Sequence, residues 1–240
     1  MSNLTILRTY AQTNPAKLPP SVLFSHSSTS LTIYDAFAKG IFHFLILPRV
    51  QAPFAVSELS SLRTLLLSGD KARAKQLITA LNEDAKTLRK EIEEEMLDRY
   101  GFTWGIWTGF HGAPSMEHLH LHVLSDDLCT ERMKNKKHYN SFHPKLGFFL
   151  DIDEVLSWFD AEDSYFSSMA KLDPKKHYEP MLKEDLSCWR CNTSMKNIPT
   201  LKAHLQEEFD SLAKREKAKM ERRRKLEEKT AARRETDATE

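Results

Sequence analysis

Two short stretches near the start of the chain have the composition of β-strands. Residues 31–35 (LTIYD) and 41–48 (IFHFLILP) are rich in β-branched and aromatic side chains, which predicts two strands. The five residues between them, AFAKG, end in Gly40 and predict a tight connection. Pro48 is expected to end the second strand, because proline cannot donate to a sheet ladder.

The next part of the chain has apolar residues spaced with the period of an α-helix. From Lys71 to about Arg99 the apolar residues recur every three or four positions, which predicts a long amphipathic helix with an acidic end. These apolar residues are Leu77, Leu81, Ala85, Leu88, Ile92 and Met96. A shorter helix is expected before it, with its N-cap at Ser57 and its end at Gly69.

Two further strands are predicted at 102–110 (FTWGIWTGF) and 118–124 (HLHLHVL), separated by the turn-like segment HGAPSME. Helices combined with an antiparallel sheet give the α+β class. We expect this domain to cover residues 21–160, after an N-terminal segment at 1–20.

The remaining residues divide by composition. Residues 161–187 mix charge, proline and aromatic residues without a period and are expected to be a linker. A compact unit is expected at 188–212, followed by a charged, mobile tail at 213–240. The tail can be a solvated helix, a basic arm or a nuclear-localisation patch around residues 221–225.

Composition narrows the class of protein only modestly. The chain has 240 residues, 40% of them hydrophobic and 29% charged, and a formal net charge of +1, which indicates no particular partner. We expect no signal peptide and no membrane-spanning segment. The cysteines are Cys129, Cys188 and Cys191; such an odd, sparse set argues for a reducing compartment rather than a disulfide framework.

Histidines are concentrated in the stretch FHGAPSMEHLHLHVLS, residues 110–125. Side chains alternate along a strand, so His118, His120 and His122 are predicted to share one face while the intervening apolar residues face the core. This face can be merely polar, can bind a metal, or can carry a nucleophilic imidazole that attacks phosphorus. The turn before the strand supplies a hydroxyl and backbone amides, which favours a phosphoryl site.

The same stretch fits the histidine-triad pattern of nucleotide hydrolases and transferases. Together with YDAFAKGIFHFLILPR, KNKKHYNSF and the C-terminal cysteine–histidine segment, it resembles the aprataxin family of DNA-adenylate hydrolases over about residues 30–210. The resemblance implies a histidine-triad fold and removal of AMP from the 5′-phosphate of DNA. It also implies a covalent histidine–AMP intermediate and no metal requirement for catalysis.

The resemblance assigns the roles of the histidines. His120 matches the nucleophile, and His111 the group that assists the leaving phosphate. His122 is expected to bond the phosphoryl oxygens and His118 to orient its neighbours. Two alternatives stay open: a hydrolase of small adenine nucleotides or dinucleotides, and a non-catalytic, zinc-dependent nucleic-acid-binding protein.

Substrate contacts are expected from three segments that match the family. The expected residues are Asp35, Phe37, Lys39, His43, Ser115, Met116, Lys137 and Tyr139. Asp35 is assigned to a ribose hydroxyl and Lys137 to a phosphate of the DNA backbone. Many relatives carry tryptophan at the position of Tyr139, and Tyr10 does not match the aromatic wedge of the family.

The segment CWRCNTSMKNIPTLKAHLQEEF has the spacing of a zinc finger. Cys188 and Cys191 are followed after twelve residues by His204, and position 208 holds Glu where a second histidine is usual. We predict one structural zinc ion held by Cys188, Cys191, His204 and Glu208, with Glu207 as the competing fourth ligand.

The implied partners are DNA with nicked or 5′-adenylated ends and AMP as product. A monomer in the nucleus, or also in the cytoplasm, is expected. Because fewer than 30 residues precede the first domain, no forkhead-associated domain is expected.

Overall fold

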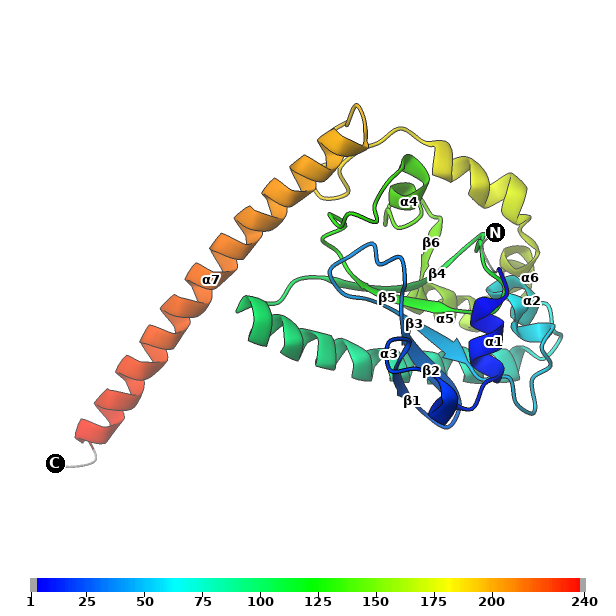
Figure 1. Cartoon of the computed structure of the whole chain (residues 1–240), viewed down its shortest axis with the longest axis horizontal. Helices are drawn as coiled ribbons and strands as arrows, with labels where there is room; N and C mark the ends of the chain where they lie inside the picture. The colour runs from blue at the N-terminus through cyan, green and yellow to red at the C-terminus, as the bar shows by residue number, and fades with distance from the viewer. Residues whose placement is uncertain (1–3, 238–240) are drawn as a thin grey trace.

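The computed structural model describes residues 4–237, with side chains described up to residue 230. An antiparallel sheet in the order β1-β2-β3-β5-β4-β6 lies at the centre of the described part (Figure 1). Its strands are β1 (Leu23–His26), β2 (Ser30–Tyr34), β3 (His43–Pro48), β4 (Ile106–His111), β5 (Leu121–Ser125) and β6 (Phe149–Asp151). The predicted α+β class is therefore confirmed.

Helices surround the sheet. The α-helices are α1 (Ile6–Gln12), α2 (Leu62–Leu66), α3 (Lys71–Tyr100), α4 (Lys136–Asn140), α5 (Ile152–Asp160), α6 (Asp163–Lys171) and α7 (Ile198–Asp237). Four short helices of other types are η1 (Pro15–Lys17), η2 (Glu58–Ser60), η3 (Pro174–Tyr178) and η4 (Glu179–Lys183). No helix between residues 4 and 237 is long and apolar enough to cross a membrane.

The long predicted helix is α3, which lies along one side of the sheet (Figure 1). The Asp70 side chain accepts a hydrogen bond from the Arg73 amide at its start, and Gly101, in the left-handed conformation at φ 75°, ends it. All six residues of the predicted apolar stripe are buried. They pack in the main hydrophobic core with Phe44, Ile46, Leu121 and Val123 of the sheet.

The predicted N-cap at Ser57 is wrong. Ser57 has helical backbone angles, precedes η2 and makes no capping bond with its side chain. Ser61 is the N-cap of α2: its backbone is extended, and its hydroxyl accepts from the Thr64 amide at 3.2 Å. The Thr64 hydroxyl in turn accepts from the Ser61 amide, which completes a capping box.

Two predicted strands are shorter than expected. β4 begins at Ile106 rather than at residue 102, and β5 begins at Leu121 rather than at residue 118. His118 has φ 96°, a backbone conformation that a regular strand does not allow. His118 and His120 therefore precede the strand, and only His122 of the three lies on it.

The stretch 161–187 is not an irregular linker. It contains α6, η3 and η4, and Phe166, Ala170 and Tyr178 are buried in the main core. At the other end, Phe209 of α7 also belongs to this core, while Leu201 and Leu205 pack in a second cluster with Leu124 and Tyr139. The domain boundaries and the mobility of the charged tail stay predictions, although the tail is helical to Asp237 (Figure 1).

A buried carboxylate connects the loop before β3 to the end of β5. Asp127 is 1% exposed and accepts hydrogen bonds from the Trp104 indole at 3.1 Å, the Ile41 amide at 3.0 Å and the Ser125 hydroxyl. Burial raises the pKa of Asp127, and these three donors oppose that shift.

Replacing Asp127 by alanine should leave the buried Trp104 indole and the partly buried Ile41 amide without their acceptor, and the Ser125 hydroxyl with only the Phe42 carbonyl at 3.3 Å. We expect Asp127→Ala to lower the free energy of unfolding by about 3 kcal/mol or more, measured by urea denaturation. Asp98→Ala, at an exposed position of α3, should change it by less than about 0.5 kcal/mol. Equal effects of the two substitutions would contradict the role given to the buried network.

Candidate active site and metal centre

The backbone kink at His118 organises the approach to β5. The His118 amide donates to the Ser60 carbonyl at 3.0 Å, and the Leu119 amide donates to the Leu59 carbonyl at 2.7 Å. The His118 ring is fully buried and its Nε2 donates to the Pro48 carbonyl at 2.7 Å. These bonds hold a residue at φ 96°, a conformation that favours glycine and costs free energy in other residues.

The kink directs the His118 carbonyl toward the ring of His120. His120 Nδ1 lies 2.7 Å from this oxygen. Because a carbonyl can only accept, Nδ1 carries the proton, and the neutral ring has its lone pair on Nε2. Burial lowers the pKa of His120, while the carbonyl bond and the charge of Asp35 oppose the shift, so the ring is neutral at pH 7.

A chain of hydrogen bonds sets the tautomer of His122 in the same way. The Lys39 backbone amide donates to His43 Nδ1 at 3.0 Å, so the proton of neutral His43 is on Nε2. His43 Nε2 lies 3.0 Å from His122 Nδ1, which must therefore accept. The proton of His122 is then on Nε2, which is buried and has no hydrogen-bond partner among the described residues.

His111, at the end of β4, completes the row of imidazoles. Its ring centroid is 4.3 Å from that of His122, which in turn is 5.0 Å from that of His120. Burial lowers the pKa of His111 and His122 well below the ordinary value, and the neighbouring histidines add to the shift. His111 Nε2 is also buried without a partner among the described residues, so both rings offer an unused nitrogen to a ligand.

The residues Asp35, His43 and His122 bring their ligand atoms within 4.8 Å of one another, as a metal site would. A metal on His43 Nε2 would require the ring proton to move to Nδ1. That atom faces the Lys39 N–H, and two donors would then oppose each other. The arrangement of Asp35, His43 and His122 is therefore better suited to sharing a proton than to binding a metal ion.

The predicted substrate loop lies beside the histidine row. Asp35 Oδ2 is 3.4 Å from His43 Nε2, and its Oδ1 accepts from the Phe37 amide at 2.7 Å. Phe37 is 59% exposed, whereas Lys39 is 9% exposed and donates to the Phe37 carbonyl. Burial lowers the pKa of the Lys39 ammonium.

Other predicted contacts are placed differently. His43 is 4% exposed and its Nε2 lies 3.0 Å from His122 Nδ1, so its ring positions that of His122, and its predicted substrate contact stays a prediction. Ser115 is exposed in the turn after β4, and Met116 packs against the cluster formed by α1 and β3. Leu45 and Leu47 of β3 are core residues of that cluster.

Lys137 is exposed on α4 as expected for a phosphate contact. Tyr139 is not available to substrate, because it is 0% exposed. Its hydroxyl donates to the Ser187 carbonyl and accepts from the Trp189 amide, each at 2.9 Å. The prediction of a substrate contact at Tyr139 is therefore wrong; the residue connects the first domain to the C-terminal finger.

The four predicted zinc ligands meet at one point. Cys188, Cys191, His204 and Glu208 have their ligand atoms within 4.8 Å of one another. Glu208 Oε2 lies 3.2 Å from Cys188 Sγ, and His204 Nε2 lies 3.2 Å from Cys191 Sγ. Glu207 is exposed, outside this cluster. Two sulfurs, one imidazole nitrogen and one carboxylate oxygen are a donor set that suits tetrahedral zinc.

Some residues of the site were not predicted. Phe142 packs against three of the histidine rings, with centroids 4.6 to 5.4 Å away, and makes the surroundings apolar. Arg190 of the finger forms an ion pair at 2.6 Å with Asp126, next to β5. Phe142 lies in the motif KNKKHYNSF, which already pointed to this part of the site. No local sequence pattern relates Asp126 to Arg190.

Comparison with known families agrees with this geometry. Residues 10–138 match the family described as "Scavenger mRNA decapping enzyme C-term binding", and residues 145–211 match "C2HE / C2H2 / C2HC zinc-binding finger". The chain is 32% identical over 185 residues to an aprataxin-like protein of Schizosaccharomyces pombe, covering 74% of this chain and 70% of that protein. The chain belongs to the aprataxin family.

Other members of the aprataxin family show the same relationship. An aprataxin-like protein of Saccharomyces cerevisiae is 41% identical over 109 residues, which is 44% of this chain and 45% of that protein. The solved structure "Hnt3 in complex with DNA and guanosine" superposes with a TM-score of 0.65 at 26% identity, covering 90% of this chain and 100% of that chain. The histidine-triad fold is thereby confirmed. This chain spans between 24% and 51% of the length of aprataxin relatives from Drosophila melanogaster, Ciona intestinalis and Danio rerio.

The buried neutral histidines predict acid sensitivity of this aprataxin-family fold. Burial lowers the pKa of both His43 and His118 from 6.5 to about 4. As the pH falls below 6.5, the unfolded chain takes up protons that the folded chain does not. The free energy of unfolding therefore falls as the pH drops below 6.5. Each of these two histidines lowers it by about 2 kcal/mol between pH 7 and pH 5.

Urea denaturation at the two pH values measures this difference. His118→Gln, which keeps a donor for the Pro48 carbonyl, should reduce the difference by about 2 kcal/mol. His26→Gln, at an exposed position of β1, should leave it unchanged. A free energy of unfolding at pH 5 that equals or exceeds the value at pH 7 would contradict the neutral, buried state of the histidines.

The finger provides a matched pair of substitutions. Glu208→Gln should weaken zinc binding by about 10-fold or more, because an amide replaces a charged ligand. Glu207→Gln changes the neighbouring glutamate and should leave affinity the same within about twofold. Zinc affinity is measured by competition with a chromogenic chelator. If Glu207→Gln has the larger effect, the fourth ligand has been assigned wrongly.

Proposed function

We propose that this chain is a hydrolase of the histidine-triad superfamily that removes AMP from 5′-adenylated DNA ends. The observation that carries the proposal is the fixed tautomer of His120. Its Nδ1–H is bound to the His118 carbonyl, so a lone pair on Nε2 is available in a row of neutral imidazoles.

In the proposed first step, His120 Nε2 attacks the phosphorus of AMP and the bond to the 5′-phosphate oxygen of the DNA breaks. The leaving phosphate takes the electron pair of that bond, and the ring becomes a positively charged N-phosphorylated imidazole. The His118 carbonyl and the Asp35 carboxylate stabilise this charge. Water then attacks the same phosphorus and loses a proton to solvent, while the bond between phosphorus and Nε2 breaks and returns its electron pair to the ring. This step releases AMP and restores neutral His120.

The neighbouring rings support both displacements. His122 offers its Nε2–H to a phosphoryl oxygen, because its Nδ1 is already occupied by His43. The His111 ring lies next to that of His122, with centroids 4.3 Å apart, where it can assist the leaving phosphate. Neither step requires a metal ion at the histidines.

The proposed DNA substrate rests on the finger and on the relatives. The donor cluster of the finger would hold one structural zinc ion. The exposed Lys134, just before α4, and Lys137, on α4, could contact backbone phosphates. The structure of the Hnt3 relative contains DNA and guanosine. We extend the proposal to a monomer that acts in the nucleus.

The test is AMP release from 5′-adenylated nicked DNA by the full chain loaded with zinc. His120→Ala should lower the rate by on the order of 10⁴-fold or more, since the nucleophile is lost. The exposed His26→Ala is the control and should keep the full rate. Denaturing the wild-type protein during turnover should trap radiolabelled AMP on the chain.

Two results would contradict the proposal. One is AMP release by His120→Ala at the wild-type rate. The other is efficient hydrolysis of a free adenine dinucleotide with no turnover of adenylated DNA, which would favour a small-molecule hydrolase.

A further inference from the structure

The helix α7 continues far past the zinc cluster as a strongly charged segment. It runs from Ile198 to Asp237, whereas the match to the zinc-finger family ends at residue 211. Its C-terminal part extends beyond the body of the molecule (Figure 1). Between residues 214 and 229 it carries nine basic and four acidic residues, a net charge of +5. Because the whole chain has a net charge of +1, the rest of the chain is net negative.

One face of α7 packs against the catalytic domain. Phe209 is buried in the main core, and Leu212 and Met220 pack against that core. Lys217 lies on the same side, with its Nζ 5.9 Å from the centre of the Phe102 ring, just after the end of α3. The opposite face of the helix is therefore turned to solvent.

The face of α7 that is turned to solvent is basic along its length. With 3.6 residues per turn, six basic side chains fall within an arc of about 140°, roughly opposite the packed face. All six are exposed, and together they form the basic face: Lys214, Arg215, Lys219, Arg222, Lys225 and Lys229. Outside this arc lie all four acidic residues of the segment, which are Glu216, Glu221, Glu227 and Glu228.

Ion pairing within the helix does not account for the basic face. Opposite charges three or four residues apart stabilise a helix, and like charges at those spacings destabilise it. Within the face, Lys229 follows Lys225 by four residues. Among residues 4–230, Lys214, Arg222 and Lys229 have no carboxylate within ion-pairing distance. The face therefore presents positive charges that an external anion would neutralise.

The composition of α7 narrows the choice of anion. A helix that lies on a membrane buries an apolar side in it. In α7 the apolar side packs against the catalytic domain as far as Met220, and from 221 to 229 the one large apolar residue is Leu226. From Lys214 to Lys229 the face is about 22 Å long, a length over which duplex DNA carries roughly 13 phosphates. These charges therefore fit a nucleic-acid duplex better than a lipid surface.

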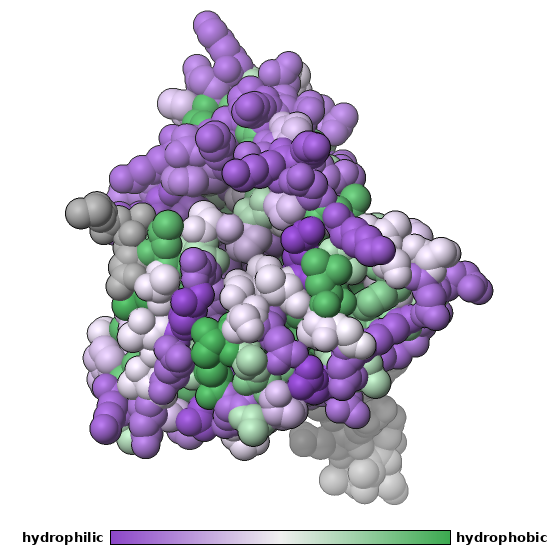
Figure 2. Space-filling view, turned by 90° about the vertical axis from the view of Figure 1, so that its right-hand side faces the viewer, coloured by the Kyte–Doolittle hydropathy of each residue, from purple (hydrophilic) through white to green (hydrophobic). Residues whose placement is uncertain are grey.

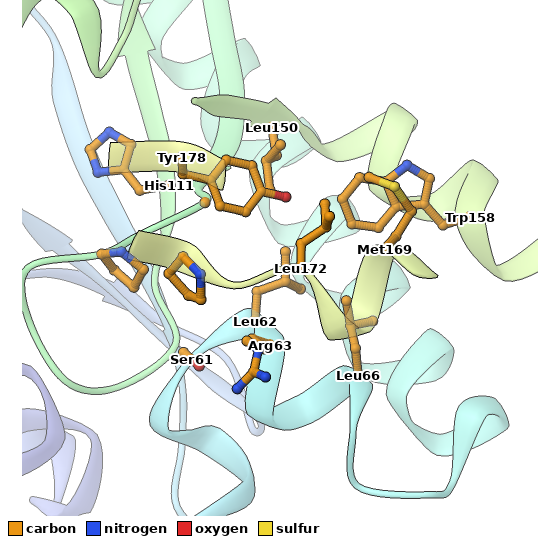
Figure 3. A pocket seen from close by; sticks show the side chains of 13 residues that line it. Ser61, Leu62, Arg63, Leu66, His111, Leu150, Trp158, Met169, Leu172 and Tyr178 are labelled. Carbon is orange, nitrogen blue, oxygen red and sulfur yellow. The ribbon is translucent and has the colours of Figure 1, made fainter. Parts of the chain in front are cut away.

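Two other features of the surface differ from the basic face. On the side that bears α1, α2 and α6, hydrophobic side chains are exposed among hydrophilic ones (Figure 2). The cavity of about 160 Å³ beside His111 is lined by core side chains such as Trp158 and Tyr178, with Arg63 at its edge (Figure 3). Binding to the phosphates of a duplex needs neither an apolar patch nor a cavity, and an exposed row of cations suits it better than either.

We propose that the basic face of α7 binds the phosphate backbone of duplex DNA, and so lengthens the stretch of duplex that the chain contacts. His204 and Glu208 of the zinc cluster lie in the same arc of the helix, so the face is continuous with the finger. DNA is the duplex in the solved structure of the Hnt3 relative. Binding at the face would be independent of base sequence and sensitive to salt. It goes beyond adenylate hydrolysis and requires only that DNA is the partner.

Fluorescence anisotropy with the full, zinc-loaded chain tests the basic face. An unadenylated nicked duplex of about 30 base pairs reports affinity without turnover. The triple variant Lys214→Gln/Arg222→Gln/Lys229→Gln removes the three charges that lack a partner. It should weaken binding by about 10-fold or more at roughly 0.1 M salt, because three phosphate contacts are lost. The slope of log affinity against log salt should become shallower by about 2 to 3.

The matched control removes the same charge from the same helix, outside the basic face. It is the triple variant Lys217→Gln/Arg223→Gln/Arg224→Gln. Because salt screens charges over about 10 Å under these conditions, this variant should weaken binding by no more than about threefold. Far-UV circular dichroism checks that both variants keep their helix content. Equal losses in the two variants, or no loss in either, would overturn the proposal.

Two further measurements separate DNA from a lipid surface and binding from hydrolysis. If the basic-face variant loses affinity for vesicles of phosphatidylserine and phosphatidylcholine but keeps its affinity for DNA, DNA is the wrong partner. Hydrolysis of a small adenylate, which has no duplex, should be unchanged by either triple variant. Normal hydrolysis with DNA binding that does not depend on the basic face would overturn this proposal alone. Absence of AMP release by the wild-type chain, with DNA binding that depends on the face, would overturn the proposed function and leave the basic face in place.

Discussion

The hydrogen bond from His120 Nδ1 to the His118 carbonyl is the interaction on which the site depends. A neutral imidazole can be nucleophilic at only one nitrogen, and this bond leaves Nε2 as that nitrogen. The carbonyl points correctly only because His118 has φ 96°, held by bonds to residues 59 and 60 and by its ring on Pro48. A strained backbone at His118 thus determines the chemistry of His120, two residues further along the chain.

Burial determines the charge of the row, while hydrogen bonds determine its tautomers. Each of the five clustered histidines has its pKa lowered by removal from water, and the charges of His43, His111 and His120 lower the pKa of neighbouring rings further. Phe142 and the sheet core keep the surroundings apolar. A positive charge that develops on His120 during the reaction would therefore be the single cation of the row, next to Asp35 and a carbonyl oxygen.

Sequence periodicity predicted the parts of the fold that local patterns determine. The apolar stripe of α3 and the inward-facing Leu119, Leu121 and Val123 are buried as expected. The spacing of Cys188, Cys191, His204 and Glu208 predicted a cluster, because residues four apart on a helix share a face. Alternation could not predict where β5 begins, since the kink at His118 depends on partners about 60 residues away in the chain.

Long-range packing explains the remaining errors. Tyr139 follows a basic run that suggests nucleic acid, yet the finger covers it and uses its hydroxyl. Residues 161–187 have no long apolar period because they form three short helices, whose buried residues are only Phe166, Ala170 and Tyr178. The cavity beside His111 is built from α2, α5, α6 and η3, and no contiguous motif encodes it.

The central claim concerns the protonation of two ring nitrogens, and ¹⁵N NMR of histidine-labelled protein at pH 7 measures it directly. Long-range proton–nitrogen correlations distinguish the two neutral tautomers and the cation. The account predicts that His120 carries its proton on Nδ1 and His122 on Nε2, and that both are neutral. A proton on His120 Nε2, or a doubly protonated His120, would leave no nucleophilic nitrogen facing the substrate and would contradict it.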